Sequence, residues 1–306
     1  AWQQQGFPRK NRFLAIDGAF HGDTLGAASL GGVEVFRRAI AGVVVDCVRV
    51  PFPEHAERAF EQLRDIIERE KDVLAAVVVE PLVQGAAGMR MYDPARLREL
   101  RQLCDANDVF LVVDEVFTGY GRTGEMWAVE HAGIAPDLMC LGKTFASLIP
   151  MGATLASERV LDAFRGGKDR ALQYGHTFCG NPLGAALARE VLAIYEDEAI
   201  VLGVQKKTPA LARAFASLGE LPGVDRVRTL GMIGAADLSP RSGGKSGGYL
   251  GELGWRVYDE ARKRGAYLRP LGDTVYVAPP LTITDDELAL LLSILRESVE
   301  VVLATS

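Results

Sequence analysis

The sequence Val109-Phe-Leu-Val-Val-Asp114-Glu115 opens a stretch that runs on to Asp137-Leu-Met-Cys-Leu-Gly142-Lys143. It contains two uninterrupted apolar runs, and each is bounded by polar residues. Such runs are typical of strands covered on both faces, as in the parallel sheets of α/β proteins. We therefore predict an α/β fold with a mainly parallel central sheet.

Asp114 and Lys143 stand where these two predicted strands end. In open α/β sheets the carboxyl ends of the strands form the edge at which ligands bind. A carboxylate at that edge can keep the ring nitrogen of a cofactor protonated, and a lysine beside it can form an imine with an aldehyde. These are the two protein groups that pyridoxal 5'-phosphate chemistry requires.

Two further loops follow predicted strands. Phe20 and His21 come after the predicted strand Arg12–Ile16, and Glu80 comes directly after the predicted strand Leu74–Val79. An aromatic side chain at a strand exit can stack on a flat cofactor ring, although an aromatic buried in a loop explains Phe20 equally well. Glycines after Glu80 indicate a site loop whose backbone approaches a ligand closely.

A capping signature, Asn181-Pro182, predicts the start of a long helix. Thr177 lies just before it. A hydroxyl and backbone amides at a helix start suit a phosphate, because the first amides of a helix lack internal partners. Thr177 as an ordinary turn residue is the alternative.

Composition limits the class of protein. The 306 residues carry a net charge of −6 and 48% hydrophobic content, which predicts a globular chain and gives no basic patch for nucleic acid. We expect no membrane span and a cytoplasmic location, since no apolar run is long enough and no signal peptide is recognisable. Four widely spaced cysteines predict buried free thiols, with no metal site and no disulfide.

The pattern of predicted helices and strands changes near Ala199, which predicts a large domain over 1–197 and a smaller α+β domain over 198–306. In the second part we predict a helix over about 208–218, a flexible surface loop over 239–248 and a short strand over Ala266–Arg269. Thr284 begins a capping box before the final helix.

The order of these motifs resembles that of the class III aminotransferases of pyridoxal-phosphate fold type I, and the resemblance covers essentially the whole chain. The motifs that carry it are Phe20-His21-Gly22, Glu80-Pro81 with Gln84, Asp114-Glu115-Val116, Gly121-Arg122-Thr123-Gly124, Gly142-Lys143, and Thr177 before Gly180-Asn181-Pro182. The loop from Glu80 to Tyr92, together with Arg269-Pro270, Tyr276 and Pro279-Pro280, is similar to that of the biotin-pathway members of the class.

The resemblance implies roles for these residues. Lys143 would carry the cofactor and move the proton of the substrate carbon, and Asp114 would pair with the ring nitrogen. Arg269 would bind the substrate carboxylate, and the alternative is a surface arginine paired with an acid such as Asp273. Further residues implied in cofactor binding are Phe20, His21, Glu80, Val116, Thr177 and Phe178, and Arg122 and Tyr276 are implied in substrate binding.

This sequence differs from the pattern of the class III aminotransferases at three places. Phe20 stands where relatives usually have tyrosine, so stacking is kept and a phenol hydrogen bond is lost. Relatives have a section upstream of the position of Ala1 that supplies small-domain elements and a phosphate loop, so we expect the site in this sequence to be incomplete. After Lys143 the chain reads Thr144-Phe145-Ala146 in place of a glycine pair.

The expected reaction is transfer of an amino group from S-adenosylmethionine to an amino-keto acid. The expected assembly is a homodimer in which Thr177 reaches the phosphate of the neighbouring subunit's cofactor. Two alternatives stay open. One is another class III reaction with acetylornithine, ornithine or a diamine, and the other is an inactive remnant or assembly module.

Overall fold

The computed structural model describes residues 1–38, 40–52, 57–146, 148–240 and 246–306, and these divide into two compact units. Unit 1 comprises residues 1–86, 90–119 and 127–197. Unit 2 comprises residues 87–89, 120–126 and 198–306. The main change from one unit to the other therefore falls between Asp197 and Glu198. Two short excursions of the chain, 87–89 and 120–126, also belong to unit 2.

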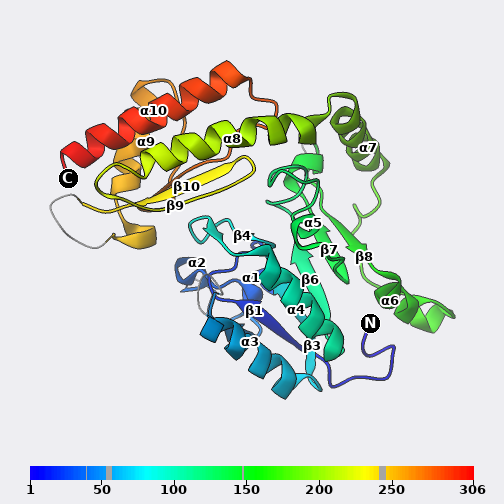
Figure 1. The fold of residues 1–306 in the computed structure, drawn as a ribbon. Coiled ribbons are helices and arrows are strands. Elements are labelled where there is room, and N and C mark those ends of the chain that lie inside the picture. The colour runs from blue at the N-terminus through cyan, green and yellow to red at the C-terminus, as the bar shows by residue number, and fades with distance from the viewer. Residues whose placement is uncertain (39, 53–56, 147, 241–245) are drawn as a thin grey trace. The chain divides into compact units, whose positions relative to one another are not determined.

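Unit 1 is built on a six-stranded sheet with the order β2-β1-β3-β6-β7-β8 (Figure 1). Neighbouring strands run parallel, except that β7 pairs with β8 antiparallel. The mainly parallel α/β fold is therefore confirmed. The strands are β1 (Arg12–Ile16), β2 (Val48–Val50), β3 (Leu74–Val79), β6 (Phe110–Asp114), β7 (Leu138–Leu141) and β8 (Ala153–Ala156).

Helices connect these strands. Asp93 caps α4 by accepting a hydrogen bond from Ala95 N, with Pro94 at the first helical position. The capping side chain satisfies an amide that the helix itself leaves without a partner. The helices are α1 (Leu25–Leu30), α2 (Glu34–Arg38), α3 (Glu57–Glu70), α4 (Pro94–Ala106), α5 (Val129–Ala132), α6 (Glu158–Leu161) and α7 (Pro182–Asp197). There are 3-10 turns at Lys143–Ala146, Asp162–Phe164 and Lys168–Arg170. The unit also contains a short hairpin formed by β4 (Val83–Gln84) and β5 (Arg90–Met91).

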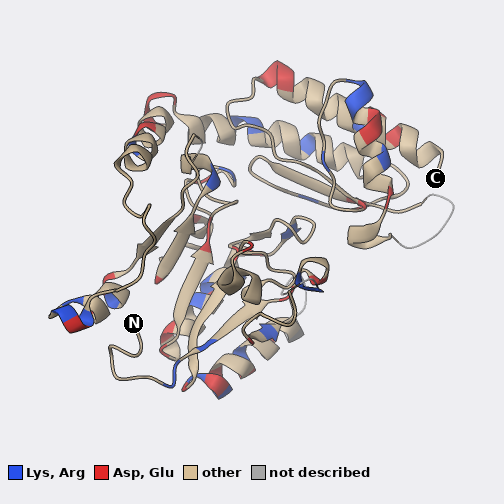
Figure 2. Cartoon of the chain, turned by 180° about the vertical axis from the view of Figure 1, so that it is seen from behind, with Lys and Arg blue, Asp and Glu red and all other residues tan. Residues whose placement is uncertain are grey.

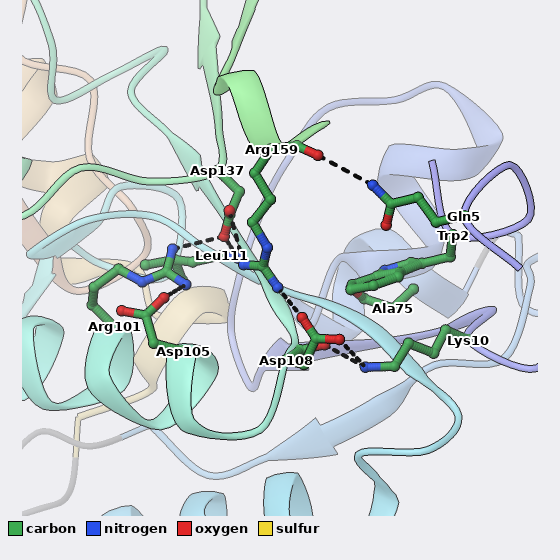
Figure 3. Close-up of polar contacts among 10 residues, drawn as sticks. All are labelled: Trp2, Gln5, Lys10, Ala75, Arg101, Asp105, Asp108, Leu111, Asp137 and Arg159. Atoms are coloured by element: carbon green, nitrogen blue, oxygen red, sulfur yellow. Dashed lines mark hydrogen bonds and ion pairs between the residues drawn. The ribbon is translucent and has the colours of Figure 1, made fainter. Parts of the chain in front are cut away.

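A buried ionic network fixes the amino ends of β6 and β7 (Figure 3). The Asp137 carboxylate accepts hydrogen bonds from Arg101 Nη1 at 2.7 Å and from Leu111 N at 2.8 Å. Arg159 joins Asp137 to Asp108, which precedes β6. Because every charge has an opposite partner, no uncompensated charge is left buried at the edge opposite to the strand exits.

Unit 2 has a three-stranded antiparallel sheet with the order β11-β10-β9. The capping box at Thr284 is present, with Glu287 N donating to the Thr284 hydroxyl. The helix over Ile200–Leu218 carries only Lys and Arg, whereas the helices over Leu253–Lys263 and Asp285–Ala304 carry charges of both signs (Figure 2). The elements are α8 (Ile200–Leu218), β9 (Val224–Leu230), β10 (Ile233–Leu238), a 3-10 turn at Gly248–Leu250, α9 (Leu253–Lys263), β11 (Thr274–Val277) and α10 (Asp285–Ala304).

Three sequence predictions were wrong. The helix predicted from about 208 begins at Ile200, because Pro209 is accommodated inside α8 and does not start it. The strand predicted over Ala266–Arg269 does not form, and Pro270, which follows it, has no N–H to extend a ladder. The four cysteines are free, but only Cys104 is buried, and Cys179 lies in an exposed segment.

Three further findings concern the described residues. No helix in that part of the chain is long and apolar enough to cross a membrane. The same residues contain no cluster of side chains that could hold a metal ion. The predicted flexible loop over 239–248 falls largely on 241–245, which lie outside the described residues.

Candidate active site

Asp114 and His21 meet at the exits of β6 and β1. His21 Nδ1 lies 2.8 Å from Asp114 Oδ2, and Asp114 Oδ1 accepts from Val116 N at 3.1 Å. The side chains are only 5% and 11% exposed. An ionised carboxylate can only accept, so this contact is a hydrogen bond when the imidazole carries a proton on Nδ1. The pair fixes an almost buried carboxylate at the sheet edge where ligands bind.

Glu80 lies directly after β3, which is the strand between β1 and β6. Its carboxylate accepts from Phe20 N through Oε2 and from Gly85 N through Oε1, each at 3.0 Å. Burial raises the pKa of Glu80 to about 7, although nearby His21 and the two amide hydrogen bonds oppose the shift. Glu80 therefore ties the loop after β1 to the hairpin after β3.

Lys143 follows β7, the other neighbour of β6, and has a positive φ of 50°. Its Nζ lies 5.3 Å from the centroid of the Phe117 ring. Gly142 packs against Val116, since a Cβ built at Gly142 would lie 3.3 Å from a Val116 methyl group. Sequence reasoning did not single out Phe117, and its position three residues after Asp114 was the only available signal.

The strands place Asp114, His21, Glu80 and Lys143 at one edge of the sheet, because β1, β3, β6 and β7 run parallel. Phe20 is half-buried and meets Phe36 edge-on, with ring centroids 5.5 Å apart. A cavity of about 130 Å³ lies beside the Phe20 ring. Phe20 is therefore partly buried beside a cavity, and the choice between ring stacking and a buried loop aromatic stays a prediction.

Thr177 and Phe178 lie in the segment 171–180, in which every residue is exposed. Phe178 is 77% exposed and Tyr174 is 90% exposed. The segment leads into α7, where Asn181 Oδ1 accepts from Leu183 N at 3.0 Å as the capping signature predicted. A hydroxyl therefore stands ahead of a helix start, and large apolar side chains around it are uncovered.

In unit 2, Arg122 is oriented by main-chain oxygens. Its Nη1 donates to Pro279 O at 2.7 Å and to Met232 O at 3.3 Å. Met232 N in turn donates to Arg122 O at 2.9 Å. The guanidinium is therefore held close to the Pro279-Pro280 motif.

Arg269 is exposed, and its charge lies near Tyr276, whose pKa is raised by burial and partly lowered by the Arg269 charge. The Asp273 carboxylate is occupied by Ser246 Oγ at 3.1 Å and Leu253 N at 2.9 Å. Within the described ranges, no acidic side chain pairs with Arg269. The alternative of an Arg269–Asp273 ion pair is therefore wrong.

Comparison with protein families decides the class. The chain matches the family Aminotransferase class-III over residues 1–299. The chain belongs to the class III aminotransferases. It is 37% identical over 318 residues to the adenosylmethionine-8-amino-7-oxononanoate aminotransferase of Geobacter sulfurreducens, covering 98% of this chain and 70% of that protein. The corresponding protein of Synechococcus elongatus is 40% identical, and 94% of this chain and 68% of that protein are covered.

The chain is shorter than these relatives, and it spans 57% of the protein of the same name from Nitratidesulfovibrio vulgaris. The corresponding enzyme of Methanocaldococcus jannaschii superposes with a TM-score of 0.90 at 29% identity, covering 98% of this chain and 70% of that one. A PLP-bound amine transaminase from an uncultivated Pseudomonas species gives a TM-score of 0.89 at 32% identity, covering 99% and 72%. The fold is therefore that of the fold type I transaminases.

Class III aminotransferases depend on pyridoxal 5'-phosphate, and the side chains of unit 1 fit that cofactor. An almost buried carboxylate, a lysine after the next strand and a hydroxyl before a helix are the groups that could bind a ring nitrogen, an aldehyde and a phosphate. Among the described residues, His21 Nε2 is buried with no hydrogen-bond partner. A buried polar atom of this kind is typical of a site whose remaining contacts come from a ligand.

Proposed function

We propose that this aminotransferase transfers the amino group of S-adenosylmethionine to 8-amino-7-oxononanoate, giving 7,8-diaminononanoate. The observation that carries the proposal is the similarity over 94–98% of the chain to two curated aminotransferases that are named for these two substrates. The Glu80–Tyr92 loop, with Gln84 and two glycines, supports the same assignment from the sequence. In this proposal residues 1–197 form the cofactor-binding domain, which contains all of unit 1, and residues 198–306 form the small domain.

The bound cofactor supplies an aldehyde that accepts the amino group and a ring that withdraws electrons from the substrate carbon. Lys143 Nζ would hold that aldehyde, and its amine would serve as the general base and acid that moves the proton of the substrate carbon. Asp114 would keep the ring nitrogen protonated, and His21 holds the Asp114 carboxylate in place at 2.8 Å. Phe20 and Val116 would pack against the ring.

Glu80 shapes the cofactor pocket by accepting hydrogen bonds from the main-chain amides of Phe20 and Gly85, each at 3.0 Å. Arg269 binds the substrate carboxylate with a two-pronged hydrogen bond, a geometry that a lysine cannot provide. Arg122 and Tyr276 orient the same substrate. The exposed position of the Arg269 side chain and the absence of an acidic partner among the described residues support this role.

The proposed assembly is a cytoplasmic homodimer in which Thr177, with Phe178 beside it, completes the phosphate site of the neighbouring subunit. Large apolar side chains rarely lie uncovered in a group on a monomer. The exposed fractions of Leu172, Tyr174, Phe178 and Leu183 range from 63% to 90%, which supports burial of this surface in a dimer.

The test is spectroscopic. The purified chain is loaded with pyridoxal 5'-phosphate and then mixed with S-adenosylmethionine without an acceptor. We expect the visible absorbance of the bound aldehyde to decay and to return on addition of 8-amino-7-oxononanoate. Decay with L-alanine or ornithine and none with S-adenosylmethionine would overturn the assignment.

Transamination of simple amines is the second candidate. Several solved structures of similar fold are amine or omega transaminases, with TM-scores from 0.89 to 0.91 and identities of 27–32%. Their identity to this chain is lower than that of the Geobacter and Synechococcus relatives, at 37% and 40%. The same absorbance experiment, with a simple amine as donor, separates the two candidates.

A further inference from the structure

The tip of the β4–β5 hairpin has an unusual backbone. Gly88 has a φ of +91° and Met89 a φ of +52°, both in the left-handed region. A residue with a side chain adopts this conformation only where its surroundings hold it there. A Cβ at Gly88 would lie 3.1 Å from Thr274 Oγ1, so the tip also lies close to β11.

Arg228, on β9, holds this tip by its main-chain oxygens. Its Nε donates to Met89 O at 2.8 Å, and its Nη2 donates to Gly88 O. The Arg228 side chain is only 11% exposed. Because a trans peptide directs its N–H opposite to its C=O, the bond to Gly88 O also turns the Met89 N–H away from Arg228. One guanidinium therefore sets the orientation of two successive peptide planes.

Asp237, on β10, keeps Arg228 in this position. Its Oδ1 accepts from Arg228 Nη2 and from Thr274 Oγ1, each at 2.8 Å. The Asp237 side chain is 8% exposed, so the pair is shielded from solvent. Arg226 binds the other oxygen, Oδ2, from a side chain that is 62% exposed. Arg228 and Arg226 thus share one carboxylate, and Arg228 is the buried one.

The base of the same hairpin tip belongs to the candidate active site. Gly85 N donates to Glu80 Oε1 at 3.0 Å. A Cβ at Gly85 would lie 3.3 Å from the Phe117 ring, and Lys143 Nζ lies 5.3 Å from the centroid of that ring. The segment 85–89 therefore connects Gly85, beside the Phe117 ring in unit 1, with the hairpin tip that Arg228 holds in unit 2.

We propose that Arg228 is a positioning residue that fixes the Gly88 and Met89 peptides and thereby sets the affinity of the aminotransferase for its keto-acid acceptor. Arg228 acts through the hairpin tip and does not itself take part in the chemistry. The effect on the acceptor rests on the proposed function. The effect on the hairpin tip does not, because it concerns only the main chain of 85–91.

The test compares Arg228→Gln with Arg226→Gln, which removes the other arginine on the same carboxylate. Hydrogen–deuterium exchange of the amides in 85–91 is measured first, without cofactor. In Arg228→Gln we expect these amides to exchange roughly tenfold faster, because a buried charge-assisted hydrogen bond is lost. Arg226→Gln should exchange as the unchanged chain does, and Arg228→Lys should lie between the two.

Steady-state kinetics with the loaded enzyme follow. Arg228→Gln should raise the KM for 8-amino-7-oxononanoate roughly tenfold and change kcat less than about twofold, because binding of the ground state and of the transition state is weakened equally. Equal exchange in Arg228→Gln and the unchanged chain, equal effects of the two glutamine variants, or faster exchange with an unchanged KM would each overturn the proposal. If the unchanged chain transfers no amino group, the proposed function fails, and the exchange experiment still decides the role of Arg228 at the tip.

Discussion

Asp114 Oδ2 lies 2.8 Å from His21 Nδ1, although the two residues are 93 positions apart in the sequence. The parallel strands β1 and β6 bring them to one edge of the sheet, with β3 and Glu80 between them. The contact with His21 fixes the orientation of the Asp114 carboxylate. Pairs of this kind hold a charge at the place where a ligand needs it.

Asp114→Asn should reduce kcat about a thousandfold, which corresponds to about 4 kcal/mol of transition-state stabilisation. The amide cannot keep the ring nitrogen protonated, while its size preserves the packing at the end of β6. Single-turnover rates and circular dichroism measure the two effects separately. A variant within tenfold of the unchanged enzyme would mean that Asp114 only supports the fold.

Borohydride reduction of the loaded enzyme should attach the pyridoxyl group to Lys143 and to no other lysine. The physical reason is position, because Lys143 leaves β7 beside the exit of β6, where Asp114 stands. Peptide mass spectrometry identifies the modified residue. Lys10, which is engaged by Asp108 at the opposite edge of the sheet, is the internal control. Modification elsewhere would remove Lys143 from the mechanism.

Glu80→Gln should change how stability depends on pH. The pKa of Glu80 is raised from 4.5 to about 7 by burial, so between these pH values the folded chain binds more protons than the unfolded chain. The free energy of unfolding therefore falls as pH rises from about 4.5 to 7, by roughly 3 kcal/mol from this one group. Urea titrations across that window measure the difference between the unchanged chain and the variant.

The matched control for Glu80 is Glu260→Gln, a partly exposed carboxyl on α9 whose pKa is lowered by hydrogen bonds from Lys263 and Arg264. That variant should not reproduce the fall between pH 4.5 and 7. A stability difference between Glu80→Gln and the unchanged chain that stays constant over this range would show that Glu80 does not titrate there.

Thr177→Ala should weaken cofactor binding by about 2 kcal/mol, or roughly 30-fold in Kd, through loss of one hydrogen bond to a charged phosphate. Because Thr177 is proposed to act on the neighbouring subunit, the loss should be seen only in the dimer. Fluorescence titration at protein concentrations above and below dimer dissociation tests both points. A monomer that binds the cofactor as tightly as the dimer would exclude the shared site.

Arg269→Lys should raise the KM for the keto acid at least tenfold and leave cofactor affinity nearly unchanged, since lysine cannot form the two parallel hydrogen bonds of a guanidinium. Removal of the carboxylate from the keto acid should then impair the unchanged enzyme much more than the variant. Arg262→Lys, at an exposed position on α9, is the control. Equal losses in the unchanged enzyme and Arg269→Lys would show that Arg269 does not meet the carboxylate.

Local sequence patterns predicted the main elements of unit 1. The strands at Arg12–Ile16 and Leu74–Val79 agree with the structure residue for residue. The Asn181-Pro182 start of α7 and the Thr284 capping box are also confirmed. These features depend on side chains only a few positions apart, so neighbouring residues suffice to specify them.

The wrong predictions concern features that depend on contacts with distant parts of the chain. Pro209 is a helix-start signal by itself, yet packing of α8 keeps five of its side chains buried on both sides of the proline. Cys179 is apolar enough for a core position, but its segment passes over an exposed surface. In both cases the tertiary environment outweighs the local preference of the residue.

The sequence by itself determined the α/β class and placed Asp114, Glu80 and Lys143 at strand exits, because an apolar run followed by a polar residue is a local signal. Only the tertiary structure decided that His21 faces Asp114, that Glu80 joins Phe20 to Gly85, and that Arg228 holds Gly88 and Met89. These contacts join residues that are mostly far apart in the chain, and their geometry follows from strand order and side-chain packing. No periodicity in the sequence carries that information.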